Sequence, residues 1–459
     1  DDEINRLFNF GRYYFGCNSR KDYPMTLQGV WTRNNGELPP WKADLHNDIN
    51  IQMTYEGYLK LGNYQEGRVF VDWMIKHKSA FKKFAKNFMK SEGLLVPGDC
   101  TQQGKELCGW PHFVSNPGCS IWVIKAFYDY YCYTKDIKFL RKEAYPFFVE
   151  TEKCIFNILE LNDDNKYQFK VLHASPEYFE NDSKALFKHQ TNFELTMLRY
   201  LYTRLIEMGK TLKKDVSHYE DVLSKLADYY RDEDGLLVIS SEQKYDMSHR
   251  HFSHMLMYKN MELVDPFVNK DTIQKDITHL ESYGPVNWVG FSPVECSELN
   301  SYIRNGEQAY KHLKDYSCFT YDNGFHMNYD CRGAGYTDFG HCVLTLEANI
   351  GYLKAVSDMF IQNFEDKLVI FPAVANKLKT GGATFKNLRT FGDHKVSGEC
   401  KDGKVAFNIE LNKKETIKLF NNLRRNPVFV IDGKKHRFNV ELDEFIVIKA
   451  KKSISYEDR

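Results

Sequence analysis

The chain has 459 residues, of which 42% are hydrophobic and 15% aromatic, and its 62 Lys and Arg side chains balance 62 Asp and Glu side chains. A chain without net charge has no overall field that would attract a nucleic acid or an anionic membrane, so we expect neither as a partner. No segment approaches the roughly 20 apolar residues that a membrane-spanning helix requires. The length suits two or three folded units.

The eleven cysteines are an odd number and are scattered without any C-x-x-C pair. This arrangement predicts reduced, mostly buried thiols rather than a framework of disulfides. The sequence begins at Asp1 and shows no apolar segment typical of signal peptides, so it leaves the cellular location open.

Residues 1–363 are expected to be mainly helical. A hydrophobic period of 3.6 residues starts near Leu7 and recurs in about a dozen segments. Without repeated sequence units, this number is compatible with six helical hairpins that close into an (α/α)6 barrel, although periodicity alone does not establish closure. The longer expected helices cover residues 65–88, 121–133, 137–160, 190–209, 216–231, 305–315 and 340–362.

The pattern changes after about residue 364. Short apolar stretches with a period of two indicate strands, and Asp402-Gly403 and Asp432-Gly433 are signals for hairpin turns. We therefore expect two domains, a helical barrel at 1–363 and a small β-sandwich at 364–459.

A polar series follows two tryptophans in the first part of the chain. His46, Asp48 and Asn50 alternate along the sequence, so an extended segment would place them on one face. Such a row can hydrogen-bond sugar hydroxyls or hold a water molecule, while Trp31 and Trp41 pack on apolar sugar faces. The alternative is a loop with an Asn or Asp helix cap and tryptophans that only anchor it.

Glu177 follows a Ser-Pro pair. Ser175 and Pro176 fit the N-cap and first position of a helix, which would make Glu177 simply a favourable first-turn acid. The functional alternative places Glu177 in an aromatic-walled pocket, where desolvation would raise its pKa and allow it to protonate a leaving oxygen.

Three histidines and an arginine occupy the seven residues from Ser248 to His254. The H-x-H-x-x-H spacing could bind zinc, but no nearby cysteine or carboxylate completes a ligand set, and Arg250 would repel a cation. We therefore expect no metal. The segment is interpreted as a polar pocket wall or as a structural hydrogen-bonded cluster.

Glu347 stands alone in the apolar run from His341 to Gly351. Burial of an acid without a partner costs free energy, so Glu347 is either a surface residue of a helix or an inner acid kept for its chemistry.

Together, in this order and at these separations, these segments resemble the catalytic domain of glycoside hydrolase family 95. Phe10-Gly11-Arg12-Tyr13 matches the family's opening, and the elements L-Q-G-x-W, P-P-W, H-x-N-x-N-x-Q-M, S-P-E and S-H-R-H-x-S-H have nearly intact counterparts. The last family element survives as His341 and Glu347, six residues apart as in the family. The resemblance covers residues 7–400.

The resemblance implies an (α/α)6 barrel followed by a β-sandwich, a glycan substrate and no cofactor. Glu177 matches the family's general acid, and Glu347 matches the aspartate that activates the water-binding residues. Asp48 and Asn50 match the two asparagines that hold the attacking water. The family's amino-terminal β-domain has no counterpart here, and the resemblance suggests an extracytoplasmic location. The positions that match residues around the sugar are His46, Arg250, His251 and His341.

Four positions depart from the family pattern: Asp48 and Thr54 replace asparagines, Glu347 replaces an aspartate, and Glu56 replaces a tryptophan. Asp48 could then act as the general base directly, which would leave Glu347 to position Asn50 or to tune Asp48.

The expected activity is inverting hydrolysis of α-L-fucosidic or related α-L-galactosidic linkages, with about 6.5–9.5 Å between acid and base carboxyls. One alternative is a disaccharide phosphorylase on a similar barrel, against which two extra acids near the water site argue. The other is a carbohydrate-binding protein without turnover, which the Asp48 departure and the missing amino-terminal domain motivate.

Overall fold

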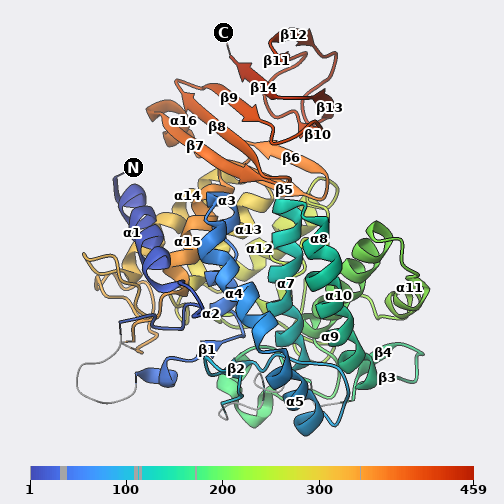
Figure 1. Cartoon of the computed structure of the whole chain (residues 1–459). Helices are drawn as coiled ribbons and strands as arrows, with labels where there is room; N and C mark the ends of the chain where they lie inside the picture. The colour runs from blue at the N-terminus through green and yellow to red at the C-terminus, as the bar shows by residue number, and fades with distance from the viewer. Residues whose placement is uncertain are drawn as a thin grey trace.

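The computed structural model of the chain describes residues 2–31, 39–107, 112, 116–170, 173–341 and 343–458. The expected fold class, an (α/α)6 barrel followed by a small β-sandwich, is confirmed (Figure 1). The helices are α1 (Asp2–Asn18), α2 (Asn50–Thr54), α3 (Tyr58–Leu61), α4 (Tyr64–Lys76), α5 (Lys78–Phe88), α7 (Pro117–Thr134), α8 (Ile137–Phe139), α9 (Tyr145–Asn157), α10 (Asn192–Thr211), α11 (Ser217–Ser224), α12 (Lys270–Ser282), α13 (Phe291–Tyr302), α14 (Gly306–Asp315), α15 (Glu347–Asp358) and α16 (Asn376–Gly381).

Two of the expected helices are shorter than predicted. The segment after Ser224 leaves the helix because the Asn192 side chain binds both backbone groups of Tyr230, at 2.9 Å and 2.8 Å. The segment before Glu347 is not helical, because Leu344 forms a β-bridge with Met327. Tertiary contacts therefore override local helical periodicity at both places.

The strands form a sandwich of two sheets, one small hairpin and one short antiparallel pair that joins distant parts of the chain. The sheet orders are β13-β10-β6-β5 and β12-β11-β14-β9-β8-β7. The strands are β1 (Leu45–His46), β2 (Asp99–Cys100), β3 (Leu159–Leu161), β4 (Tyr167–Phe169), β5 (Ile361–Phe364), β6 (Lys367–Ile370), β7 (Ala383–Thr390), β8 (His394–Lys401), β9 (Lys404–Glu410), β10 (Glu415–Phe420), β11 (Val428–Ile431), β12 (Lys434–Arg437), β13 (Phe445–Ala450) and β14 (Ser453–Glu457).

Both expected hairpin turns are confirmed. Asp402 and Gly403 connect β8 to β9 with φ angles of 52° and 74°, and Asp432 and Gly433 connect β11 to β12 with 48° and 84°. Two consecutive positive φ angles match the twist of the flanking strands and favour Asp-Gly. The domain boundary near residue 364 stays a prediction, and the first strand of the sandwich begins at Ile361.

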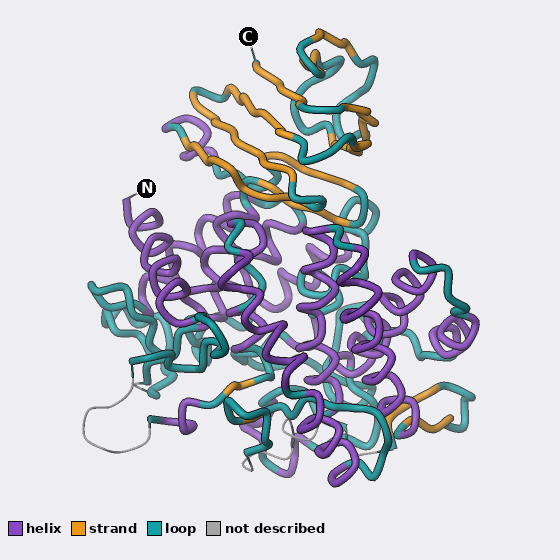
Figure 2. Tube along the Cα trace, in the orientation of Figure 1, coloured by secondary structure: helices purple, strands orange, loops and turns teal. Residues whose placement is uncertain are grey.

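The loops that carry the predicted site lie at the end of the barrel away from the sandwich, together with the paired strands β1 and β2 (Figure 2). Helices α2 and α15 begin there and pack against each other. Their close approach requires Gly351, since a Cβ at this position would lie 2.4 Å from the Met53 side chain. This contact fixes Asn50, the first residue of α2, relative to Glu347, the first residue of α15.

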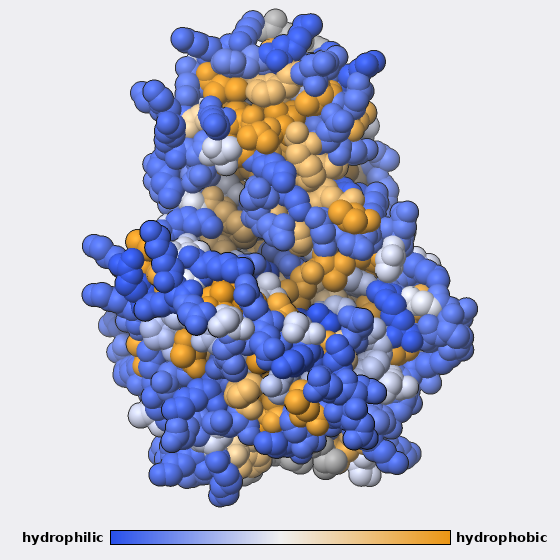
Figure 3. Space-filling model, turned by 90° about the vertical axis from the view of Figure 1, so that its right-hand side faces the viewer, coloured by the Kyte–Doolittle hydropathy of each residue, from blue (hydrophilic) through white to orange (hydrophobic). Residues whose placement is uncertain are grey.

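Apolar side chains gather on the sandwich in the face shown in Figure 3, whereas the barrel below is mostly hydrophilic on that face. Of the nine cysteines in the described part of the chain, all are free and six are buried, which confirms the prediction of mostly buried thiols there. Cys108 and Cys342 lie outside the described residues. None of the described helices combines the length and apolarity needed to cross a membrane.

Candidate active site

A cavity of about 230 Å³ opens among the loops at the end of the barrel that carries β1. Phe291, Asn328, Phe339 and Thr345 contribute to its wall and were not identified from the sequence. Chain segments separated by up to about 300 residues therefore meet at one site. Of the ten predicted site residues, those that line the cavity are Trp41, His46, Asn50, Glu177, Arg250, His251 and His341.

Glu177 lies in a left-handed turn rather than at the start of an α-helix. Its φ is 52°, and Phe179 and Glu180 have φ angles of 50° and 54°. The Ser175 hydroxyl, expected as a helix cap in one interpretation, is hydrogen-bonded to the Ser253 hydroxyl. The capping interpretation is therefore wrong. Non-glycine residues in this conformation are strained by about 1–2 kcal/mol each, and such strain is found mainly at functional sites.

Three donor groups converge on one oxygen of Glu177. Arg250 Nε and His251 Nε2 each lie 2.8 Å from Glu177 Oε2, and a second Arg250 nitrogen lies at the same distance. The terminal nitrogens of Arg250 also donate to both oxygens of Glu180, at 2.6 Å and 2.9 Å. The guanidinium packs over the Phe339 ring, 4.9 Å from its centroid. Arg250 is thus fixed between two carboxylates and an aromatic face.

The electrostatic environment of Glu177 differs from the one expected. Burial alone would raise its pKa, but the charges of Arg250 and His251 outweigh burial and hold the pKa well below its usual range. The expectation that desolvation would raise this pKa is therefore wrong. No local pattern could reveal the balance, because Arg250 and His251 lie more than 70 residues away along the chain.

Asp48 is buried next to Glu177. Neither of its carboxylate oxygens accepts a hydrogen bond from the described residues. Burial raises the pKa of Asp48; the positive charge of His46 opposes this shift, and the negative charge of Glu177 adds to it. Asp48, His46 and Glu177 each have a polar atom within 4.8 Å of the others. Oxygens this close leave little room for a water molecule between them, which favours Glu347 as the base, and the role of Asp48 as a base stays a prediction.

Two further aspartates that the sequence analysis missed hold His46. His46 Nδ1 lies 2.9 Å from Asp44 Oδ2, and His46 pairs with Asp99 where β1 runs antiparallel to β2. Burial and then the adjacent Asp44 raise the pKa of Asp99 to about 9, so Asp99 is protonated at neutral pH and donates to Asp44. Burial would lower the pKa of His46, but Asp44 and Asp48 raise it well above its ordinary value. Asp44 and Asp48 therefore favour the charged form of His46.

Glu347 is an inner acid rather than a surface residue, since it is only 1% exposed. Thr345 Oγ1 donates to Glu347 Oε1 at 2.8 Å. Burial raises the pKa of Glu347 to about 7, although hydrogen bonds from Thr345 and Asn50 oppose the shift. Burial thus brings the pKa of Glu347 into the range of a general base that works at neutral pH.

The two tryptophans have different positions. Trp41 lines the cavity, and its ring lies 6.5 Å from that of His46. Trp31 is outside the cavity wall and packs edge-on against Tyr14 and Phe325, each at 5.2 Å. Its contact with a substrate stays a prediction. His341 is exposed at the rim, with its ring 5.1 Å from that of Phe339.

The histidines of the H-x-H-x-x-H segment do not meet at a common point. His251 contacts Glu177, whereas the ring of His254 stacks on Tyr245 at 4.4 Å. Among the described residues they form no group with metal-ligand spacing. This placement favours the polar-wall interpretation for His251 and the structural one for His254.

Comparisons with known proteins agree with this architecture. The family model "Glycosyl hydrolase family 95 catalytic domain" matches residues 2–360. Alpha-L-fucosidase 2 of Arabidopsis thaliana is 24% identical over 433 residues, which cover 88% of this chain and 48% of that protein. The chain thus spans about half the length of this curated relative.

Solved structures show the same fold at low sequence identity. "Putative kojibiose phosphorylase from human microbiome" superposes with a TM-score of 0.66 at 14% identity, over 98% of this chain and 66% of that one. The Streptomyces avermitilis α-L-rhamnosidase complexed with L-rhamnose gives 0.54 at 12% identity, over 99% of this chain and 41% of the other. Because the family model spans most of the sequence, the chain belongs to the glycosyl hydrolase family 95 catalytic domain family.

Proposed function

We propose that this chain is an inverting glycoside hydrolase that cleaves α-L-fucosidic or closely related α-L-galactosidic linkages in glycans. The observation that carries the proposal is that Glu177 and Asn50 border one cavity, while Glu347 contacts Asn50 from behind. An acid that protonates the leaving oxygen and a base that activates water are the two groups an inverting glycosidase needs. The curated fucosidase relative supports the choice of sugar.

Glu177 is the proposed general acid. The contacts that Arg250 and His251 make with the Glu177 carboxylate all fall on Oε2. This leaves Glu177 Oε1 to face the glycosidic oxygen. Arg250 and His251 hold the pKa of Glu177 low, whereas burial and the charge of Glu177 raise the pKa of the nearby Asp48. We propose that the two carboxyls titrate as a pair, that Arg250 stays with Glu180 when a sugar enters, and that desolvation then favours the protonated form of Glu177.

Glu347 is the proposed general base, acting on a water molecule held by Asn50. Its pKa of about 7 is close to that of an efficient base at neutral pH. His46, Arg250, His251 and His341 would hold the sugar hydroxyls, and Trp41 would pack on an apolar sugar face. The chemistry as proposed uses no cofactor.

The proposal can be tested by assaying hydrolysis of an aryl α-L-fucoside and an aryl α-L-galactoside in parallel, with and without phosphate. We expect phosphate-independent release from at least one of them, with the β-anomer of the sugar appearing first in proton NMR spectra. The α-anomer as the first product would exclude inversion. Release that requires phosphate would assign phosphorolysis instead, and binding without release would assign a lectin-like role.

A further inference from the structure

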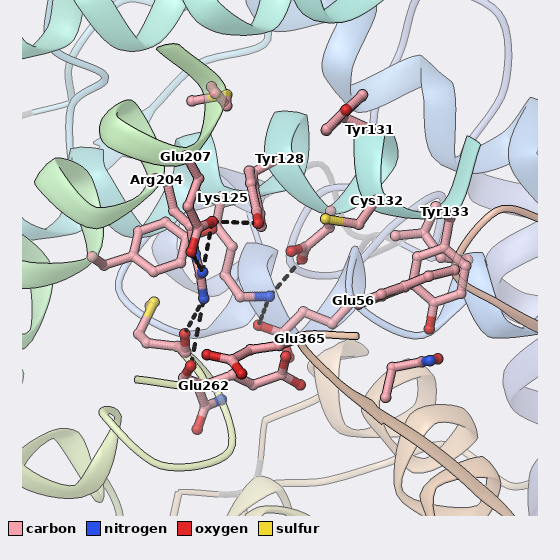
Figure 4. Close-up of a pocket in the computed structure, with 18 of the residues that line it drawn as sticks. Glu56, Lys125, Tyr128, Tyr131, Cys132, Tyr133, Arg204, Glu207, Glu262 and Glu365 are labelled. Carbon is pink, nitrogen blue, oxygen red and sulfur yellow. Dashed lines mark hydrogen bonds and ion pairs between the residues drawn. The ribbon is translucent and has the colours of Figure 1, made fainter. Parts of the chain in front are cut away.

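A second cavity, of about 370 Å³, lies at the opposite end of the barrel, next to the sandwich (Figure 4). Its wall combines residues of α7, α10 and α15 with the β5–β6 turn, and it shares no residue with the wall of the catalytic cavity. Helix α15 spans the distance, because Glu347 lies at the catalytic end and Lys354 faces the second cavity. Seven residues of α-helix correspond to about 10 Å. Ligand sites often form where two domains meet.

The charges of this cavity are balanced. Its wall contains six basic and six acidic side chains. Asp358 is fully buried and binds the ammonium groups of Lys60, Lys259 and Lys354, all three of which line the cavity. A strongly charged guest would meet as many like charges as opposite ones, so the cavity favours a neutral polar guest.

Glu56 has hydrogen-bonding capacity that the protein does not use. Its carboxylate lies between two ammonium groups, 3.9 Å from Lys125 and 3.8 Å from Lys354. Both distances exceed a direct hydrogen bond. Glu56 Oε1 is buried, and no described residue donates a hydrogen bond to it. A hydroxyl group could donate to this oxygen and accept from a lysine at the same time.

Tyr200 provides a second unused group. Its side chain is 1% exposed, and its hydroxyl has no hydrogen-bond partner in the described part of the chain. The ring itself is held in place, because Arg204 stacks between Tyr128 and Tyr200 at 4.7 Å and 5.1 Å. Arg204 also donates to Glu207, so this side of the cavity is rigid.

The remaining wall is aromatic. Tyr131, Tyr133 and Phe391 border the cavity, and the rings of Tyr133 and Phe391 meet edge to face at 5.2 Å. Aromatic faces beside paired charged groups suit molecules that carry both apolar C–H faces and several hydroxyls. The volume falls within the range of small-molecule sites.

We infer that this cavity is a second saccharide site, which binds one neutral mono- or disaccharide through Glu56 and Tyr200. The inference goes beyond the proposed hydrolysis and does not depend on it. Sugar hydroxyls would fill the gaps beside Glu56, and the Tyr200 hydroxyl would gain its missing partner. Glu56, which replaces the family's tryptophan, supplies the charged hydrogen-bond acceptor of this site.

Calorimetry on the whole chain with L-fucose, D-galactose and lactose tests the inference, with inorganic phosphate and putrescine as charged probes. We expect a neutral sugar to bind, and Glu56→Gln and Tyr200→Phe each to weaken that binding by about tenfold or more. Tyr200→Phe loses a hydrogen bond to the ligand, and Glu56→Gln replaces a charged acceptor by a neutral, weaker one. Tyr245→Phe is the matched control, because it also removes a buried hydroxyl without a partner among the described residues, outside both cavities.

Turnover of an aryl glycoside separates this site from the catalytic one. Glu56→Gln and Tyr200→Phe should keep wild-type kcat and a cooperative thermal melt while losing sugar affinity. The inference is overturned if both variants bind every sugar like wild type, if sugar binding disappears only with Arg250→Ala, or if only phosphate or putrescine binds.

Discussion

Arg250 holds Glu177 in its ionised form, with 2.8 Å between Arg250 Nε and Glu177 Oε2. The same guanidinium forms a two-pronged ion pair with Glu180, which lies at the cavity edge and is largely exposed. Glu180 therefore competes for the charge that stabilises ionised Glu177. The charge of Glu180, which does not touch the reacting atoms, therefore affects the pKa of Glu177, the proposed acid.

Glu180→Gln should shift the alkaline limb of kcat/KM to lower pH. Without Glu180, Arg250 acts on Glu177 alone, so the pKa of Glu177 falls further and the acid loses its proton earlier. The shift should be less than about one pH unit, since exposed ion pairs contribute about 1 kcal/mol or less and one pKa unit is about 1.4 kcal/mol. Glu180→Asp keeps the charge and is the control. An unchanged profile would contradict the coupling.

Glu177→Gln should reduce turnover of a natural oligosaccharide by about 10² to 10⁴-fold, because an amide cannot donate the proton. An aryl glycoside with a good leaving group should lose much less. The melting temperature should fall only slightly, because Arg250 keeps Glu180 as a partner. More than a tenth of wild-type turnover on the oligosaccharide would exclude the role of general acid.

Asp48→Asn and Glu347→Gln separate the two candidates for the base. Glu347→Gln should lower kcat by about 10² to 10⁴-fold on both kinds of leaving group. Asp48→Asn should keep more activity but move the alkaline limb to lower pH, because the pair with Glu177 loses one of its two titrating groups. An inactive Asp48→Asn beside an active Glu347→Gln would restore Asp48 as the base.

Glu347→Gln should also change the pH dependence of stability. The folded-state pKa of Glu347 is about 7 against an ordinary value of 4.5. Between these two pH values Glu347 is ionised in the unfolded chain but still protonated in the folded one, so the free energy of unfolding of the wild type falls as pH rises. The variant has no such group at position 347. Its free energy of unfolding relative to wild type should therefore not be raised by this effect near pH 4, and should be raised by at most about 3 kcal/mol above pH 7. Urea unfolding at pH 4.5, 6 and 8 measures it, and a constant difference would contradict the shifted pKa.

Substitutions of Trp41 and Trp31 should affect different quantities, substrate binding and the stability of the fold. Trp41→Ala should raise KM by about tenfold, or about 1.4 kcal/mol, with little change in melting temperature. Trp31→Ala removes a ring packed on Tyr14 and Phe325 and should destabilise the fold by about 2 kcal/mol. Equal effects on KM would instead place both rings at the substrate.

Regular elements were the part of the fold that local patterns could predict. The expected helix at 190–209 is α10, which begins with a capping box at Thr191, and both Asp-Gly turns are where the sequence placed them. The predicted end of a helix was wrong where a side chain distant in sequence binds the backbone, as Asn192 binds that of Tyr230. Such contacts join residues far apart in sequence, and no short-range pattern contains them.

The site was predictable in its residue types but less so in its electrostatics. Seven of the ten predicted residues line one cavity, because the family motifs identify them directly. The left-handed turn at Glu177 could not be anticipated, since Ser-Pro-Glu is a typical start of a right-handed helix. Asp99 acts on His46 only because β1 pairs with β2. Asp44, two residues before His46, and Glu180, three residues after Glu177, are missed acids that lie close in sequence.

The barrel and the sandwich share hydrogen bonds near the junction between α15 and β5, and these bonds bear on whether the barrel can fold alone. Lys60 of α3 donates to the Ile361 carbonyl at 2.7 Å, and Gln362 donates to Ser301 in α13 at 2.8 Å. Tyr64 of α4 reaches Asp393 between β7 and β8 at 2.9 Å. Residues after position 360 thus pair with polar groups of three barrel helices, and a chain cut there would deprive a buried lysine, a helix carbonyl and a tyrosine hydroxyl of these partners. The barrel and the sandwich should therefore unfold together, so that the end of the barrel that carries the site depends on β-structure at the far end.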